Sequence, residues 1–339
     1  MAVRCVKEQS GYIRPCSRKK SDIFQVLASI MKINSVCAIF VCYFPDHVQL
    51  SHAVGVMRPQ VGAVILIDNG ADPQVRQWLA DEDKRGAITH IVMETNVGVA
   101  AGQNIGISWA RQHGFSHVLI MDQDSVAASD MVLRLMDTLS TLERSGRKVG
   151  AIGPKLLYTN TTESFHFIRL GLTGNLVHLP PDASGPVLVD IIISSGTLIP
   201  LDVIGTVGGM DESLFIDNVD VEWCFRAASL GFKLYGDIGA EMEHTLGDTV
   251  KRFWFLRWQE VIVHKPLRLY FIMRNRVWLY FRSYTPMLWV MQDLIRICAK
   301  FLIFTIVVPP RRHNFTMMLS GLWDGLAGRG GSCQPTKNL

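Results

Sequence analysis

The hydrophobic residues in the first half of the chain fall into short continuous runs, and the segments between these runs have helical periodicity. The apolar runs predict strands at residues 36–43, 61–67, 89–94 and 117–121. The intervening patterns predict helices at 73–84, 104–113 and 129–145. Strands that are apolar on both faces and alternate with helices indicate a mostly parallel sheet covered by helices on both sides. The expected fold class is therefore α/β.

The second half has a different pattern. Apolar runs predict strands at 149–156, 187–200 and 232–237, and a short helix is expected at 219–230. Gly231 follows that helix and is a typical C-terminal stop signal, because glycine readily adopts the left-handed conformation that ends helices. From Phe253 onward the chain becomes aromatic and basic, and we expect this part to be helical.

The composition narrows the class of protein. Hydrophobic residues make up 48% and charged residues 19%, which excludes intrinsic disorder for most of the chain. A net charge of +4 is too small to predict nucleic acid as the main partner. The 7 cysteines form no C-x-x-C pair, so the usual spacing of a zinc site is missing. Residues 1–32 show no cleavage pattern of a secretory signal, and a flexible N-terminal extension is expected.

Two of the predicted strands end in acidic residues. The strand at 117–121 runs into Asp122-Gln123-Asp124, and the strand at 61–67 runs into Asp68. In parallel α/β sheets, ligands bind beyond the carboxyl ends of the strands. Two carboxylates one residue apart suit a shared Mg²⁺ or Mn²⁺, which prefers oxygen ligands. The alternative is ordinary turn chemistry, since Asp-Asn-Gly and Asp-Ser both favour turns.

A glycine-rich run follows the third predicted strand. Glycines 98, 102 and 106 recur every four residues around an expected helix start, where backbone N–H groups favour phosphate. The G-x-G-x-x-G spacing of dinucleotide-binding proteins and the G-K-[ST] of nucleotide-binding P-loops are both absent. An oxidoreductase of the dinucleotide-binding type is therefore disfavoured.

Three acids lie close together further along the chain. Asp217, Asp220 and Glu222 are interleaved with aromatic and aliphatic residues. Carboxylates in apolar surroundings have raised pKa values and can act as general bases. The alternative is a solvated helix start, where acids interact favourably with the helix dipole. His244 follows the last predicted strand and could complete a metal site or contact phosphate, although a single histidine is more often structural.

Together these segments resemble the family 2 glycosyltransferases, and within them the bacterial rhamnosyltransferases of surface-polysaccharide synthesis. The similarity extends from Val36 to about Tyr280. The segments that carry it are the opening strand with Tyr43 and Pro45, Asp68-Asn69-Gly70, the N-x-G-x-A-x-G-x-N-x-G run from Asn96, Asp122-Gln123-Asp124-Ser125, Ser195-Gly196, Gly209-Met210-Asp211-Glu212, FIDNVDVEWCFRA at 215–227, and 270–280 with its Arg-Asn-Arg core.

The resemblance implies an A-type glycosyltransferase (nucleotide-diphospho-sugar transferase) fold and a role for each matching residue. Asp68 would hydrogen-bond the nucleotide base, and Asp122 would contact ribose or metal. Asp124 would bind the divalent cation, Mg²⁺ or Mn²⁺, that bridges the donor diphosphate, and His244 would assist the metal or the diphosphate. Further contacts to the nucleotide sugar would come from Tyr43, Asn96, Gly98, Gly102, Asn104 and Arg226.

The resemblance also implies that Asp220 is the catalytic base. Val219 stands where the family has the glutamate of a Glu-Asp pair, so Asp217 and Glu222 stay open as alternatives. The Q-x-x-R-W motif of processive synthases is missing, which indicates a single sugar transfer per acceptor.

The implied reaction is the metal-dependent, inverting transfer of L-rhamnose from dTDP-β-L-rhamnose to a saccharide or lipid-linked acceptor. Such a reaction belongs to the synthesis of O-antigen, lipopolysaccharide or a similar bacterial surface polysaccharide. Two alternatives stay open: the same chemistry with another sugar nucleotide, such as a UDP-hexose or another dTDP-deoxysugar, and a non-catalytic protein that binds sugar nucleotides.

The C-terminal region suggests contact with a membrane. Residues 285–308 form an apolar helical segment that carries Asp293, Arg296 and Lys300 on one stripe, and three charges disfavour a membrane-spanning helix. An interfacial helix at the inner face of the cytoplasmic membrane fits this pattern, and the alternatives are packing on the catalytic core or a homodimer interface. We therefore divide the chain into an extension (1–32), a catalytic domain (33–250), a helical, membrane-associating region (251–325) and a flexible tail (326–339).

Overall fold

The computed structural model describes residues 29–158, 167–172, 176–177, 185–244, 249–255 and 257–332. Most of the predicted N-terminal extension lies outside these residues, and residues 29–34 are helical. The elements that follow are β1 (Val36–Cys42), α2 (His47–Met57), η1 (Arg58–Gln60), β2 (Ala63–Asp68), α3 (Pro73–Lys84), β3 (Thr89–Val92), α4 (Val99–Gln112), β4 (His117–Met121), β5 (Ser125–Ala127), α5 (Met131–Arg144), β6 (Val149–Tyr158), β7 (Phe167–Ile168), β8 (Leu176–Val177), β9 (Pro186–Val189), β10 (Thr197–Pro200), α6 (Leu201–Val207), η2 (Glu212–Leu214), α7 (Val219–Ser229), β11 (Lys233–His244), β12 (Thr249–Phe255), β13 (Arg257–Val263), α8 (Pro266–Phe281), α9 (Met287–Ile306) and α10 (Arg311–Leu326).

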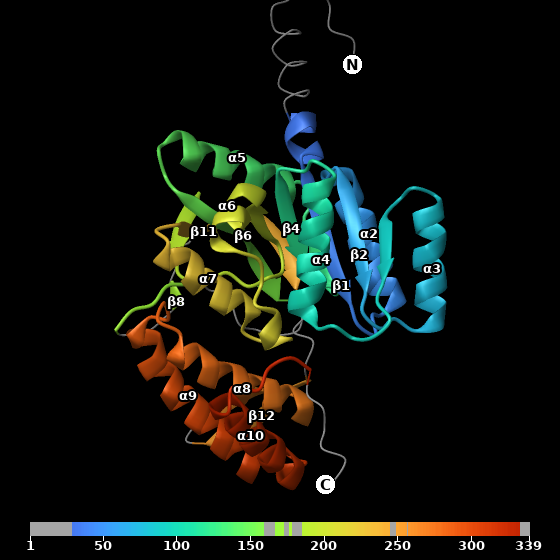
Figure 1. Ribbon diagram of the computed structural model, residues 1–339. Coiled ribbons are helices and arrows are strands. Elements are labelled where there is room, and N and C mark those ends of the chain that lie inside the picture. Colours follow the sequence, from blue (N-terminus) through green and yellow to red (C-terminus); the bar gives the residue numbers. More distant parts are fainter. Residues whose placement is uncertain are drawn as a thin grey trace, which may run out of the picture.

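A mixed sheet with the strand order β3-β2-β1-β4-β10-β6-β11-β5 forms the centre of the molecule (Figure 1). β1 is parallel to β2 and β4, whereas β10 is antiparallel to both of its neighbours. Alternate residues of β1 enter two different cores, as expected for a strand that is buried on both faces. One core contains Phe40 with residues of α2, α3 and α5, and the other contains Ile39 with residues of α4, α6 and α7. The predicted α/β class is confirmed, but the sheet is mixed and not mostly parallel, because β10, β5 and β9 each run antiparallel to the strands they pair with.

The boundaries of several predicted elements agree closely with the structure, and α4 is an instructive exception. It begins at Val99, five residues before the predicted start. Glycines lower helix propensity, but here they allow α4 to pack closely against β1. A Cβ atom on Gly102 would lie 2.8 Å from the side chain of Val41, and one on Gly106 would lie 2.5 Å from that of Ile39. Tertiary packing therefore overrides the local preference.

The strand predicted at 187–200 is wrong as a single element. The structure divides it into β9, which pairs with β11, and β10, which lies between β4 and β6. Gly196 has a φ of 77°, a left-handed conformation that interrupts an extended strand. The break brings residues 194–196 to the end of β4, where Gly196 N–H donates to Ile120 O.

The prediction that the chain is helical from Phe253 onward is wrong for the first part of this region. β12 and β13 form an antiparallel hairpin that ends at Val263. Both strands are rich in β-branched and aromatic residues, which favour extended structure. These residue types indicate strands here, whereas the mixture of aromatic and basic residues had suggested helices.

Three helices follow the hairpin and form a layer beside the sheet domain (Figure 1). α10 packs closely on α8, because a Cβ atom on Gly321 would lie only 2.3 Å from Tyr270 O. α9 completes the layer. Its Asp293 was expected in a charged stripe with Arg296 and Lys300, but it is buried. Asp293 pairs with Arg276 at 3.1 Å and accepts a hydrogen bond from Tyr280 Oη at 2.7 Å. No helix in the described part of the chain is long and apolar enough to cross a bilayer.

The beginning of the predicted C-terminal tail contacts the rest of the protein. Gly331 N–H donates to Ser213 O at 2.9 Å, and Arg274 Nη1 donates to Gly331 O at 2.6 Å. Residues up to 331 therefore return to the segment just before α7. The domain boundaries themselves stay predictions.

Candidate active site

Three predicted metal ligands lie together at one end of the sheet. Asp122 follows β4, Asp124 precedes β5, and His244 ends β11. Each offers one ligand atom, and these atoms lie within 4.8 Å of one another. β5 pairs antiparallel with β11 in a register that places His244 opposite Ser125. The strand pairing therefore brings a histidine to a D-x-D motif that is more than 100 residues earlier in the chain.

A chain of hydroxyl groups supports this cluster from behind. Ser125 Oγ lies 2.7 Å from His244 Nδ1, and Ser195 Oγ donates to Ser125 Oγ at 2.8 Å. Ser195 Oγ also accepts a hydrogen bond from Asp122 N–H at 3.3 Å. Because Nδ1 is taken by Ser125, His244 would ligate a metal through Nε2. Ser195 lies in the loop that splits the predicted strand at 187–200.

The electrostatics of the cluster suit a divalent cation. Burial, together with the nearby charges of Asp124 and Asp220, raises the pKa of Asp122 to about 7. Burial lowers the pKa of His244, although Asp124 partly opposes this shift. A neutral imidazole and carboxylates that repel one another are a donor set that a cation would stabilise. The residues therefore fit the metal that the resemblance implies.

The structure distinguishes the three acids around α7. Asp220 lies in the first turn of α7, where Ser194 N–H donates to its Oδ2 at 3.3 Å. Burial raises the pKa of Asp220, and its charge raises the pKa of Asp122, which places these two carboxylates in one electrostatic site. Asp217 instead forms an ion pair with Arg268 at 3.1 Å.

Glu222 is almost fully buried at 1% exposure and belongs to a structural network. Its carboxylate accepts hydrogen bonds at 2.8 Å from both Nε and Nη2 of Arg226, and a further one from Tyr284 Oη. Arg226 also donates to Val207 O and Gly209 O, both at 2.7 Å. Glu222 and Arg226 therefore hold α7 and the neighbouring backbone together, and we do not assign them to the candidate active site.

Asp68 is completely buried at the end of β2. Its carboxylate accepts hydrogen bonds from Gly70 N–H at 3.1 Å, from Ala71 N–H at 2.7 Å and from Arg76 Nε at 2.6 Å. Burial alone would raise the pKa of Asp68, but the hydrogen bonds from Arg76, Ala71 and Gly70 outweigh it and lower the pKa. In this structure the carboxylate therefore orders the turn after β2.

Gln123, whose role the sequence did not reveal, connects the ends of β1 and β4. Its side-chain amide pairs with the backbone of Tyr43, accepting from the N–H at 2.8 Å and donating to the C=O at 3.1 Å. The ring of Tyr43 lies over Gly70, where a Cβ atom would be 3.0 Å from it. These contacts bring the loops after β1, β2 and β4 together beside the acidic cluster.

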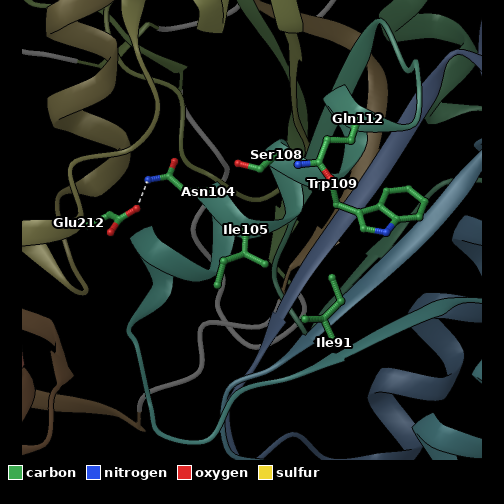
Figure 2. A pocket seen from close by; sticks show the side chains of 7 residues that line it. All are labelled: Ile91, Asn104, Ile105, Ser108, Trp109, Gln112 and Glu212. Carbon is green, nitrogen blue, oxygen red and sulfur yellow. Dashed lines mark hydrogen bonds between the residues drawn. The ribbon is translucent and has the colours of Figure 1, made fainter.

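The predicted residues around the start of α4 organise two neighbouring loops. Asn96 Oδ1 accepts hydrogen bonds from Asn69 Nδ2 at 2.7 Å and from Gly98 N–H at 2.9 Å. Asn104 exchanges hydrogen bonds with the backbone of Met210 and donates to Glu212 Oε1 at 2.8 Å. Asn104 also lines a cavity of about 360 Å³ along α4 (Figure 2). The cavity is lined by Ile91, Asn104, Ile105, Ser108, Trp109, Gln112 and Glu212, a set without any member of the acidic cluster.

The loop between η2 and α7 has an unusual backbone. Phe215, Asp217 and Asn218 have φ angles of 64°, 64° and 62°, although none of them is glycine. Phe215 O accepts hydrogen bonds from the N–H groups of Val99 and Ala100, at 2.7 and 3.3 Å, and so caps the start of α4. Such backbone strain persists only where surrounding structure holds it, and it is enriched at functional sites.

Comparison with known proteins agrees with this geometry. The family model described as glycosyl transferase family 2 matches residues 60–169, a span that includes Asp68, Asp122 and Asp124. The dTDP-rhamnosyl transferase RfbF of Shigella flexneri is 26% identical over 264 residues, which cover 77% of this chain and 85% of the relative.

Solved structures show the same fold at low sequence identity. GalNAc-T7, crystallised with UDP, GalNAc and Mn²⁺, matches with a TM-score of 0.55 and 13% identity over 84% of this chain. The chain spans about half of that protein, 54% of its length. S. aureus TarS 1-349 in complex with UDP-GlcNAc matches with a TM-score of 0.52 and 13% identity, over 87% of this chain and 81% of that one.

The fold is that of the A-type glycosyltransferases, with an acidic cluster at the carboxyl end of its central strand β4. The similarity to glycosyl transferase family 2 covers the part of the chain that contains Asp68, Asp122 and Asp124.

Proposed function

We propose that this protein is a metal-dependent, inverting rhamnosyltransferase that acts on dTDP-β-L-rhamnose. The observation that carries the proposal is the meeting of Asp122, Asp124 and His244 beside Asp220 at one end of the sheet. The donor assignment is supported by the similarity to RfbF over most of both chains. The acceptor is a saccharide or lipid-linked saccharide of a bacterial surface polysaccharide, such as O-antigen or lipopolysaccharide.

Asp122, Asp124 and His244 would hold Mg²⁺ or Mn²⁺, which neutralises charge on the leaving diphosphate when it is bound. Ser125 and Ser195 keep the histidine and Asp122 in place. Tyr43, Asn96, Gly98 and the start of α4 would contact the nucleotide, whereas Asp68 would act through the turn that it orders.

Asp220 takes the proton from the acceptor hydroxyl as the oxygen forms a bond with the anomeric carbon. The bond from that carbon to the diphosphate oxygen breaks, and dTDP leaves with its electron pair. A single displacement inverts the configuration, so the β-linked donor gives an α-linked product. The raised pKa of Asp220 makes its carboxylate a stronger base than an ordinary aspartate.

A panel of sugar nucleotides tests the donor and the metal together. The protein is incubated with dTDP-rhamnose, UDP-glucose or UDP-GlcNAc, with Mn²⁺ or with EDTA, and released nucleoside diphosphate is quantified. We expect turnover of dTDP-rhamnose with Mn²⁺ and none with EDTA or with Asp124→Ala. The exposed Asp81→Ala serves as the matched control and should keep full activity. Preferential use of UDP-glucose would reject the rhamnose assignment, and full activity in EDTA would reject the metal.

We also propose that the enzyme is peripheral at the inner face of the cytoplasmic membrane. α9 and α10 carry a set of exposed large apolar side chains, which we call the apolar stripe: Met287, Met291, Leu294, Ile295, Leu302, Ile306, Phe315, Leu319, Trp323 and Leu326. Arg296, Arg311 and Arg312 are exposed on the same two helices. Asp293, the acid of α9, is buried and pairs with Arg276 of α8. Apolar side chains beside cations match an anionic lipid surface.

A further inference from the structure

One face of α8 contacts the loop between η2 and α7. Four residues at helical spacing form this contact: Arg268, Phe271, Arg274 and Asn275. Residues three and four positions apart lie on the same side of a helix. The loop that they contact contains the strained residues Phe215, Asp217 and Asn218, and it leads directly into Asp220.

Asn275 makes the most extensive contacts. It is fully buried, and its Nδ2 lies within hydrogen-bond distance of three backbone carbonyls: Leu214 O, at the end of η2, at 3.0 Å, and Ile216 O and Asp217 O, in the loop, at 2.7 and 2.9 Å. Its Oδ1 accepts a hydrogen bond from Arg274 Nε at 3.0 Å, which fixes the orientation of the amide. The hydrogen bonds of Asn275 Nδ2 therefore go to the backbone of this segment and not to the side chains of the loop residues.

Arg274, the preceding residue, holds the end of η2, directly before this loop. Its buried guanidinium donates to Ser213 O at 3.1 Å and to Leu214 O at 2.9 Å, and it reaches Gly331 O at 2.6 Å. The guanidinium lies over the ring of Phe271, at 4.8 Å from its centroid. That ring in turn stacks on Phe215, with 5.1 Å between centroids.

The loop passes this constraint on to two parts of the active site. Phe215 O caps the start of α4, which contributes to the candidate nucleotide site, and Asn218 O accepts the hydrogen bond from Glu222 N–H in the first turn of α7. Asp220 lies between these positions. Three non-glycine residues with positive φ are disfavoured by local preference, and the contacts from α8 help to hold this shape.

We propose that Arg274 and Asn275 are positioning residues of the transferase site, which hold the strained 215–218 loop so that Asp220 and the start of α4 are correctly placed. This inference rests on the proposed function. It makes the C-terminal helical layer a part of the active-site architecture in addition to its proposed role at the membrane.

The test compares Asn275→Ala with Asn314→Ala. Asn314 is a matched control, because it is also a buried asparagine of the C-terminal layer whose Nδ2 donates to two backbone carbonyls, Phe304 O and Val308 O. Removing it destabilises the layer without a direct contact to the loop. Asn275→Ser, which keeps a small hydroxyl donor, provides a second variant in case Asn275→Ala does not fold.

Four quantities are measured on the whole chain: amide hydrogen exchange, turnover, the affinity for dTDP and the melting temperature. Amide hydrogen exchange at Val99 and Ala100 reports the cap from Phe215 O, and we expect about tenfold faster exchange in Asn275→Ala because the hydrogen bonds that fix the loop are lost. Turnover of dTDP-rhamnose with Mn²⁺ should fall about 100-fold through misplacement of the base. The affinity for dTDP should change by a smaller factor, because the cluster on β4 and β11 stays intact. Asn314→Ala should lower the melting temperature but leave exchange and turnover near wild type.

Unchanged exchange at Val99 and Ala100 in a folded Asn275 variant would overturn the proposal. So would faster exchange with normal turnover, or equal losses of turnover in Asn275→Ala and Asn314→Ala. A wild-type protein that turns over no sugar nucleotide would instead reject the proposed function, and the exchange measurement would still decide whether Asn275 holds the loop.

Discussion

The hydroxyl of Ser125 lies 2.7 Å from Nδ1 of His244, across the antiparallel pairing of β5 and β11. A hydroxyl at this position can accept the hydrogen of Nδ1 and direct the lone pair of Nε2 to a metal. The contact thus connects the D-Q-D-S segment after β4 with the end of the last strand of the central sheet.

Loss of this contact should weaken metal binding while all three ligands remain. We expect Ser125→Ala to lower the affinity for Mn²⁺ by about 10–100-fold, as is typical when a residue that orients a metal-bound histidine is removed. Titration calorimetry with Mn²⁺ measures the affinity directly, and turnover at saturating Mn²⁺ should largely recover. Ser51→Ala, at a half-buried position of α2 far from the cluster in sequence, is the control. Wild-type Mn²⁺ affinity in Ser125→Ala would contradict ligation through His244.

Replacement of the acids around α7 should separate the base from its neighbours. We expect Asp220→Asn to lower turnover by about 10²–10⁴-fold, the usual contribution of a general base, with little change in dTDP affinity. Glu222→Gln should mainly lower the melting temperature, since it weakens the buried pair with Arg226. Steady-state kinetics and thermal unfolding of both variants provide the comparison. A larger loss of turnover in Glu222→Gln, or in Asp217→Asn, would move the base away from Asp220.

The pH dependence of stability should reveal the turn after β2. The pKa of Asp68 is lowered in the folded protein by its hydrogen bonds, including the ion pair with Arg76 at 2.6 Å. Its ionised form therefore stabilises the fold above the ordinary aspartate pKa, and this stability is lost as the pH falls through the lowered value. We expect Arg76→Gln to be less stable than wild type at neutral pH, with the difference shrinking below a pH of about 4. Denaturant unfolding at a series of pH values measures this difference. A gap that stays constant down to acidic pH would show that Asp68 is not the titrating group.

Membrane contact through the apolar stripe can be tested with vesicles. We expect the protein to co-sediment with vesicles of equimolar phosphatidylglycerol and phosphatidylcholine, and less with pure phosphatidylcholine. Ile295 and Leu302 are 74% and 57% exposed on α9, and the double change Ile295→Glu with Leu302→Glu should abolish binding. Val48→Glu is the matched control, because Val48 is also 74% exposed but lies on α2. Wild-type binding by the double variant would reject this surface, and concentration-dependent dimerisation without lipid would favour a second copy of the chain.

Local sequence patterns sufficed for much of the fold. Continuous hydrophobic stretches mark β1 and β4. Asp72 and Pro73 mark the start of the helix at 73–84. The sequence also suggested that the D-x-D motif and His244 lie together, and the structure brings their ligand atoms within 4.8 Å of one another. In contrast, the division of residues 187–200 into two strands depends on pairings with β4, β6 and β11, which no local pattern encodes.

The roles of single residues depended still more on the tertiary structure. The sequence does not distinguish Asp217, Asp220 and Glu222, because each is an acid with apolar neighbours. Arg268 forms an ion pair with Asp217, and Arg226 forms one with Glu222. Asp220 instead lies close enough to Asp122 to raise its pKa.

By itself the sequence determined the α/β class, the order of the main elements and the acids that end its strands, because hydrophobic periodicity and strand-end chemistry are local properties. Only the tertiary structure showed which acid lies beside Asp122 and what the Arg-Asn-Arg segment contacts. The side chains of Arg274 and Asn275 meet the carbonyls of Leu214 and Ile216 about 60 residues away. Hydrogen bonds to backbone carbonyls place almost no constraint on the side chains of the residues they hold, so such a contact leaves little trace in sequence and becomes visible only in the folded chain.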